Sequence, residues 1–352
     1  MMAIYHRFNI KATFKMRILR FFLQKTLFCG CNIAILEQYY PANMNFSDKG
    51  RYCMFKENTA ERKLFIASSH GFCNGVRRAL ECVEELLKSP SGKQPVYIYN
   101  EIVHNSFIVN DLKSRGVGFV HSLDEIPDNS VVVWSAHGVP PQLEAAAAAR
   151  GLQTVDATCP LVKKVHNSAQ AHSQAGDAVI FIGHAKHPET VGVLGCGDIY
   201  CVGSVEDCAA LPDFEPSRKI VILTQTTWYS EDIARIIEVL KKRYGSLEMA
   251  SGICYATTER QKAVRDLLET DGIQALIVIG SPNSSNSNRL CDVARSHNAE
   301  AFLVDDPQEL CSMDLEKFSR IGITAGASAP ENLLKQAVEI LTSTHNYTLV
   351  RK

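Results

Sequence analysis

The sequence has no hydrophobic run long enough to cross a membrane. No window reaches the roughly 18 consecutive apolar residues that a spanning helix needs. It also has no excess of charge of either sign, because 37 Lys and Arg residues balance 38 Asp and Glu residues and the formal net charge is -1. Without a general positive field the surface as a whole does not attract a phosphate backbone, although a local basic patch stays open. We therefore expect neither a membrane protein nor a nucleic-acid-binding protein.

Two nucleotide-binding signatures are also missing. The chain contains neither a Walker-type loop nor a G-x-G-x-x-G loop, so the sequence indicates neither a nucleoside triphosphate nor NAD as a ligand. Cysteine, in contrast, is abundant, with 12 among 352 residues. The chain is long for a disulfide framework and has no clear secretion signal, so we expect a cytoplasmic protein whose thiols are free or bind a metal.

The first 60 residues differ in composition from the rest, because several basic residues but no acid precede Glu37. An acid-poor, basic start is typical of an organelle transit peptide, which would place the protein in a plastid-type organelle. The other interpretation is a non-functional extension, since Met16, Met44 and Met54 offer later start positions. Both interpretations stay open, and the cysteines of this segment receive no role: Cys29, Cys31 and Cys53.

From Lys63 onward, short apolar strands alternate with helical segments, which is the pattern of parallel α/β units. Continuous runs such as Val131–Trp134 and Ala275–Ile279 fit strands that helices cover on both faces. One order recurs three times: a strand leads to a cysteine, a helix follows directly, and the cysteines are about 90 residues apart. We predict an α/β fold of three pseudo-symmetric units arranged as a trefoil, with residues 1–60 outside the core and units at 61–158, 159–252 and 253–345.

The third unit is expected to lack a closing strand, because the chain runs out after the helix that ends near Leu341. The strand before Cys73 is left over, so we expect it to complete the third unit. Ligands of open parallel sheets bind at the carboxyl ends of the strands. Three units around one axis would therefore direct their polar loops and their cysteines into a single central cavity.

The three repeated cysteines are Cys73, Cys159 and Cys254. None belongs to a C-x-x-C pair, which argues against a zinc ribbon or a thioredoxin-like site. Each stands at a predicted helix start, where exposed N–H groups favour the thiolate. Three thiolates suit a cubane iron–sulfur cluster with one open iron that can act as a Lewis acid. The alternative is a packing role, which is also what we expect of the remaining cysteines: Cys82, Cys196, Cys201, Cys208, Cys291 and Cys311.

Polar loops follow the predicted strands. Imidazole, hydroxyl and amide groups with helix N-termini behind them suit a compact anion such as diphosphate. The alternatives are structural histidines and, for residues 284–288, a capped turn. The candidate anion-binding residues are His104, His137, His187, Ser284, Asn286 and Ser328.

A candidate proton donor, Glu189, follows His187-Pro188 at a strand end. A carboxyl in a closed cavity has a raised pKa and can act as a general acid near neutral pH. The alternative is an acid that caps a helix start. Thr226 has three open interpretations: a proton relay, a group that holds a substrate hydroxyl, or a turn residue.

Several long motifs lie in order between Lys63 and Leu341, at residues 71–76, 135–139, 156–162, 183–189, 254–258, 283–290 and 324–330. Together they resemble the LytB-type family of 4-hydroxy-3-methylbut-2-enyl diphosphate reductases. There are small departures: His70 stands where arginine is expected, and Thr190-Val191 replaces the usual Val-Glu. Neither departure affects a proposed ligand or proton donor.

The resemblance implies a trefoil around a [4Fe–4S] cluster and reductive removal of an allylic hydroxyl, giving isopentenyl and dimethylallyl diphosphates as the last step of non-mevalonate isoprenoid biosynthesis. It implies a ferredoxin or flavodoxin as electron donor. It further implies Cys73, Cys159 and Cys254 as cluster ligands and Glu189 as proton donor, with His187 and Thr226 facing the substrate hydroxyl. The implied diphosphate contacts are His104, His137, Ser284, Ser285, Asn286 and Ser328.

Two other functions compete with a reductase. A non-catalytic iron–sulfur sensor or scaffold protein would keep the cysteines but would need neither Glu189 nor the anion-binding loops. A cluster-free phosphate-binding protein would use the cysteines only for packing.

Overall fold

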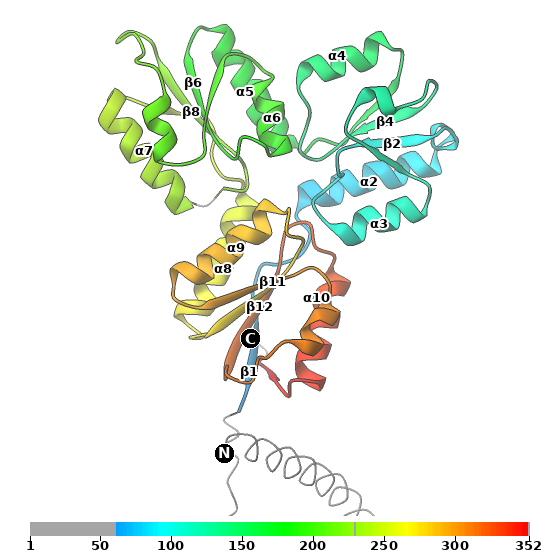
Figure 1. The fold of residues 1–352 in the computed structure, drawn as a ribbon, viewed down its shortest axis with the longest axis vertical. Helices are drawn as coiled ribbons and strands as arrows, with labels where there is room; N and C mark the ends of the chain where they lie inside the picture. The colour runs from blue at the N-terminus through cyan, green and yellow to red at the C-terminus, as the bar shows by residue number, and fades with distance from the viewer. Residues whose placement is uncertain (1–60, 229, 351–352) are drawn as a thin grey trace, which may run out of the picture. The chain divides into compact units, whose positions relative to one another are not determined.

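The computed structural model describes residues 61–228 and 230–350. These residues form three parallel sheets with helices packed around them (Figure 1). Every strand pair in the described part of the chain is parallel, so the predicted parallel α/β fold is confirmed. The transit-peptide question and the cysteines before residue 60 lie outside the described residues. No described helix combines the length and the apolar character that a membrane span requires.

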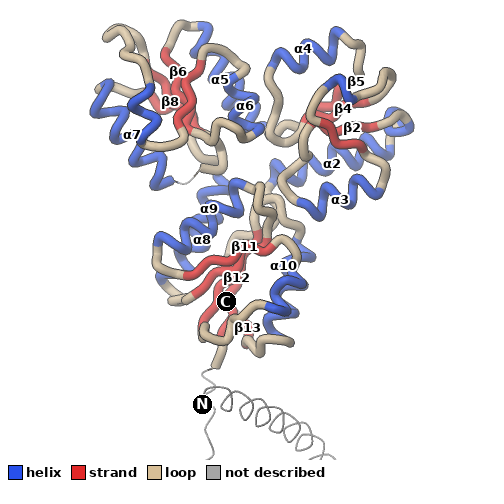
Figure 2. Tube along the Cα trace, in the orientation of Figure 1, coloured by secondary structure: helices blue, strands red, loops and turns tan. Residues whose placement is uncertain are grey.

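The first sheet has the strand order β3-β2-β4-β5. Figure 2 shows its strands with helices beside them. Its strands are β2 (Val96–Tyr99), β3 (Gly118–Val120), β4 (Val131–Trp134) and β5 (Gln153–Asp156), and the helices of this part of the chain are α2 (Asn74–Lys88), α3 (Ser106–Ser114) and α4 (Pro141–Ala149).

The second sheet repeats this arrangement in the order β7-β6-β8-β9. Its strands are β6 (Ala178–Ile182), β7 (Ile199–Val202), β8 (Ile220–Thr224) and β9 (Glu248–Met249), and its helices are α5 (Pro160–Gln174), α6 (Pro188–Leu194) and α7 (Ser230–Tyr244).

The third sheet has the order β11-β10-β12-β1-β13 and contains the N-terminal strand. In Figure 1 the blue strand β1 lies among strands of the C-terminal part of the chain. It pairs with β12 and occupies the place that β5 and β9 hold in the other sheets. The strands are β1 (Lys63–Ile66), β10 (Ala275–Ile279), β11 (Glu300–Val304), β12 (Arg320–Ala325) and β13 (Thr348–Val350), and the helices are α8 (Tyr255–Glu269), α9 (Ser285–Ser296) and α10 (Glu331–Ser343). The boundaries of the three units stay predictions.

The central strands are hydrophobic throughout because helices cover both of their faces. Every residue of β4, β6, β8 and β10 is buried. In the third sheet, alternate residues of β10 enter separate clusters: Ile277 packs with α10, and Val278 packs with α8 and α9. This two-sided burial explains why the Val/Ile runs could be recognised in the sequence.

Some expectations were wrong. The third sheet does have a further strand, because β13 follows α10 and pairs with β1. It is only three residues long and none of its residues is fully buried, so it has no recognisable run in the sequence. Helices α3 and α6, which are short, were not identified from the sequence. Cys311 is exposed in a short 3-10 turn and does not pack in the core. Cys196, Cys208 and Cys291 are buried as expected.

Candidate active site

The three repeated cysteines stand at equivalent places, each immediately before a helix. Cys73 caps α2 and its Sγ accepts a hydrogen bond from the amide of Val76 at 3.4 Å. Cys254 caps α8 in the same way, with the amide of Thr257 at 3.4 Å from its Sγ. Cys159 precedes α5. The predicted position of each thiol at a helix start is therefore confirmed.

The amides at the helix starts favour the thiolates as expected, but burial outweighs them at two of the three cysteines. Burial raises the pKa of the Cys159 thiol, and the amides of Leu161 and Val162 oppose that effect without cancelling it. Burial likewise raises the pKa of the Cys254 thiol against its hydrogen bonds from Thr257. Desolvation disfavours the charged form. A cationic centre between Cys159 and Cys254 would offset this cost and favour their thiolates.

The three thiols line one cavity of about 100 Å³. Gly75, at the start of α2, keeps room open between two of them. A Cβ at Gly75 would lie 2.6 Å from Sγ of Cys159 and 3.8 Å from Sγ of Cys73. The donor chemistry and the room kept free by this glycine fit a metal–sulfur centre held by the three sulfurs.

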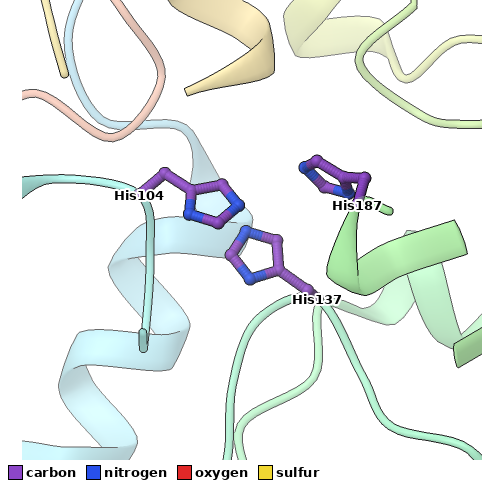
Figure 3. Close-up of side chains that lie close together, drawn as sticks. All are labelled: His104, His137 and His187. Carbon is purple, nitrogen blue, oxygen red and sulfur yellow. The ribbon is translucent and has the colours of Figure 1, made fainter. Parts of the chain in front are cut away.

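Three histidines line the same cavity as the thiols, and Figure 3 shows their rings gathered together. His104 follows β2, His137 follows β4 and His187 follows β6. The rings of His104 and His137 are stacked, with centroids 4.1 Å apart and 24° between their planes. The ring of His187 meets both edge-on, at 5.2 Å and 5.4 Å. Histidines from two different units therefore form one cluster.

This histidine cluster suits an anion better than a metal ion. Its candidate ligand nitrogens lie within 4.8 Å of one another. The lone pair of an imidazole nitrogen lies in the ring plane, however, and the nearly parallel planes of His104 and His137 do not direct two lone pairs at a common point. Burial places the pKa of His137 well below its usual value and lowers the pKa of His187 to about 3. In the free protein these two rings are neutral.

Hydrogen bonds on the far side of the rings set their orientation. Nδ1 of His104 lies 2.9 Å from Oε2 of Glu101, which leaves Nε2 of His104 buried without a partner among the described residues. Glu101 also accepts a hydrogen bond from Asn283. Nδ1 of His187 accepts the amide of Glu189 at 3.1 Å. That bond leaves the ring proton of neutral His187 on Nε2, the donor side.

The serine-rich loop forms the start of α9. Ser284 caps this helix by accepting the amide of Ser287, so the capped-turn interpretation is correct for this side chain. Oδ1 of Asn286 accepts the amide of Ala327 at 2.8 Å, while its Nδ2 is buried without a partner among the described residues. Buried polar groups nearly always have partners. Asn286 and His104 line the same cavity. Because Nδ2 of Asn286 can only donate, it points to a ligand that accepts hydrogen bonds.

Glu189 lies in the first turn of α6 and is 2% exposed. Its two oxygens accept hydrogen bonds from Thr226, from the amide at 2.7 Å and from the hydroxyl at 3.0 Å. Burial nevertheless raises the pKa of Glu189 to about 7, against the lowering effect of these bonds. The carboxyl can therefore carry or release a proton near neutral pH.

Every candidate site residue from the sequence lines this one cavity. Their individual roles stay predictions. Sequence reasoning missed Glu101, although it lies three residues before His104. It also missed Thr227, which donates a hydrogen bond to Ser285 at 3.0 Å and so links the second unit to the third.

Comparisons with known proteins agree on one family. The family described as "LytB protein" matches residues 64–342. The 4-hydroxy-3-methylbut-2-enyl diphosphate reductase of Nitrosomonas europaea is 44% identical over 286 residues, covering 79% of this chain and 87% of the relative. The reductase of the same name from Actinobacillus pleuropneumoniae serotype 7 is 44% identical over 285 residues, covering 79% and 89%.

Two solved structures are also similar. The E-1-hydroxy-2-methyl-but-2-enyl-4-diphosphate reductase of Plasmodium falciparum superposes with a TM-score of 0.77 at 34% identity, over 82% of this chain and 91% of that one. A second structure is of (E)-4-hydroxy-3-methyl-but-2-enyl diphosphate reductase, described as the terminal enzyme of the non-mevalonate pathway. It superposes with a TM-score of 0.58 at 31% identity, over 80% and 99% of the two chains.

Proposed function

This chain belongs to the LytB protein family, and on that premise we propose that it reduces 4-hydroxy-3-methylbut-2-enyl diphosphate to isopentenyl diphosphate and dimethylallyl diphosphate. The allylic C–O bond breaks, the hydroxyl leaves as water with one proton, and the allyl group takes up two electrons and a second proton. The observation that carries the proposal is the shared cavity, where three thiols, a carboxyl that titrates near pH 7 and anion-binding loops meet.

LytB-family enzymes are iron–sulfur proteins. The finer proposal is a [4Fe–4S] cluster on Cys73, Cys159 and Cys254, supported by the buried thiols and the room that Gly75 keeps open. When bound, the cluster would supply electrons and one iron without a protein thiolate as a Lewis acid. The electron donor is proposed to be a ferredoxin or flavodoxin.

The diphosphate is proposed to occupy the side of the cavity lined by the histidines and the start of α9. A helix start with free N–H groups favours phosphate oxygens. Nε2 of His104 and Nδ2 of Asn286 have no partner among the described residues. Glu101 lies at Nδ1 of His104, so Nε2 is the ring nitrogen left for the diphosphate. The remaining proposed contacts are His137, Ser284, Ser285 and Ser328.

Glu189 is proposed to deliver the proton. Its raised pKa keeps a fraction of the carboxyl protonated at neutral pH. Thr226 binds both carboxyl oxygens and so fixes their direction. His187, the residue just before α6, keeps its Nε2–H free to donate because its Nδ1 accepts the amide of Glu189. We place His187 and Thr226 at the substrate hydroxyl on these grounds.

The competing function, an iron–sulfur sensor or scaffold, has less support. A scaffold needs the thiols but gains nothing from a buried carboxyl that costs free energy to ionise. It also has no use for unpartnered donors beside stacked imidazoles. A cluster-free phosphate-binding protein fails to explain three thiols at equivalent helix starts.

The test is iron, sulfide and turnover measured together on anaerobically purified protein. We expect brown protein that contains iron and sulfide and that reduces the allylic diphosphate with a low-potential donor. Cluster-bearing protein without turnover would favour the scaffold, and iron-free, colourless protein after full cluster assembly would remove both cluster functions. A cytoplasmic location is part of the proposal, with a plastid-type organelle as the alternative. Following residues 1–60 fused to a fluorescent protein separates the two.

A further inference from the structure

One imidazole outside the proposed set of substrate contacts lies between two of the site's elements. His166 projects from the middle of α5. The Cε1–Nε2 edge of its ring faces two glycines from different parts of the chain. A Cβ on Gly138 would lie 2.9 Å from Cε1 of His166, and a Cβ on Gly192 would lie 2.7 Å from the same atom. Real Cβ atoms do not approach this closely, so both positions need a glycine while the ring is present.

The two glycines belong to the elements that carry the proposed substrate residues. Gly138 directly follows His137, and Gly192 lies on α6, the helix that begins after His187 and contains Glu189. A Cβ on Gly192 would also lie 3.6 Å from the backbone carbon of Gly138, so it would fill the space between the two backbones beside the ring. The loop of the first unit and the helix of the second unit therefore meet at one imidazole.

The edge of the ring that faces the glycines has no polar partner in the described part of the chain. Nε2 of His166 is buried and makes no hydrogen bond to any described residue. Burial lowers the pKa of His166 to about 4, so the imidazole is neutral and packs by shape. Contacts of this kind transmit small displacements, because packed interiors do not deform freely.

We propose that His166 is a positioning residue that fixes the spacing between the His137 loop and helix α6, and thereby the position of His137 at the diphosphate relative to His187 at the substrate hydroxyl. The inference rests on the proposed function of the histidine cluster, and it adds a residue that touches neither the substrate nor the thiols. A misplacement of about 1 Å in such a site costs as much as a hundredfold in activity. Packing on two glycines is the feature that makes the spacing adjustable by single substitutions.

The test measures binding of inorganic pyrophosphate to the cluster-bearing protein by calorimetry, which needs no turnover. His166→Ala is expected to weaken binding about tenfold, and so is Gly192→Ala, whose methyl group pushes the ring or the loop aside. The matched control is His172→Ala on the same helix. Nδ1 of His172 lies 2.7 Å from Oδ2 of Asp177, and neither residue lines the cavity. Substitution of His172 is therefore expected to leave pyrophosphate binding unchanged.

The double variant separates positioning from general loss of structure. If the two side chains compete for one space, Gly192→Ala should cost about tenfold in the native background and nothing further in His166→Ala protein. Additive losses would overturn the proposal, as would native pyrophosphate binding in either single variant. Should His166→Ala fail to fold, His166→Asn replaces it as the second background. The proposal is again supported only if Gly192→Ala weakens binding less in the His166→Asn protein than in the native protein. Absence of turnover in the native protein with normal pyrophosphate binding would refute the proposed reaction and leave this inference standing.

Discussion

Glu189→Gln should make the protein more stable above neutral pH while it removes most of the turnover. Burial raises the pKa of Glu189 from 4.5 to about 7. The folded protein therefore binds a proton more tightly than the unfolded chain, and this contribution is complete below pH 4.5 and lost as pH rises to 7. At about 1.4 kcal/mol per tenfold change in proton binding, the loss reaches roughly 3 kcal/mol at pH 8. A glutamine at this position has no proton to lose, so the variant does not undergo this loss of stability.

The assay compares thermal unfolding of the native protein and the variant, both cluster-bearing and anaerobic, between pH 5 and pH 8. All other titrating groups cancel in the difference. With about 2 cal/mol/K of unfolding entropy per residue, 3 kcal/mol corresponds to a higher melting temperature of about 5 °C for the variant at pH 8. At pH 5 the difference should shrink to about 1 °C. The glutamine side chain of the variant can keep the hydrogen bond from the Thr226 amide, and the threonine hydroxyl can reverse the direction of its own bond.

The turnover of the Glu189→Gln variant, unlike its stability, should fall. A general acid typically contributes about 10²- to 10⁴-fold, so kcat should fall by that factor. In the native protein kcat/KM should decline as pH rises through 7, because only protonated Glu189 can donate, and the residual activity of the variant should lack this decline. Parallel melting curves for the two proteins across the pH range would show that the carboxyl is not desolvated. Full activity of the variant would remove Glu189 from the mechanism.

Three further predictions concern the rest of the cavity. Pyrophosphate binding at pH 7 should take up protons and strengthen as pH falls, because burial depresses the pKa of His137 and a bound anion raises it; equal heats in buffers of different ionisation enthalpy would contradict this. Glu101→Gln should raise KM about tenfold with little change in kcat, since it weakens the bond that orients His104; an unchanged KM would exclude the orienting role. Gly75→Ala should lower the iron content severalfold, because its methyl group would lie 2.6 Å from Sγ of Cys159. Gly151→Asn is the control, because a Cβ on the exposed Gly151 has no atom within 4 Å and asparagine tolerates the left-handed backbone there. Full iron loading of Gly75→Ala would mean that the cysteine side chains can move aside.

The sequence was informative wherever local chemistry decides the structure. Strands such as β6 and β10 are buried on both faces, so their Val/Ile runs are continuous and visible. The start of α9 was partly visible because Ser284 is a favourable N-cap residue. The edge strand β13 and the two-residue strand β9 are stabilised by neighbours that lie far away in the chain, and no local pattern marks them.

The same difference between local pattern and tertiary contact applies to the residues of the site. The repeated strand–cysteine–helix order led to three thiols in one cavity, because equivalent positions in repeated units must face a common axis. Glu101 and His166 were missed because their importance depends on tertiary contacts. His166 is an ordinary mid-helix residue until Gly138 and Gly192, each more than 20 residues away, are folded against it.

The threefold repeat also explains how one cavity can serve a symmetric cofactor and an asymmetric substrate. Each unit contributes one thiol at the same helix start, which suits a cluster with three equivalent corners. The loops that follow the equivalent strands differ: the first unit supplies two imidazoles, the second an imidazole, a carboxyl and a threonine, and the third hydroxyls and an amide. A substrate with an anionic end and a neutral hydroxyl end needs this inequality. If the three thiols and the loops that follow the strands act separately, Ser284→Ala should weaken pyrophosphate binding and leave the iron content unchanged. Cys254→Ser, in contrast, should lower the iron content.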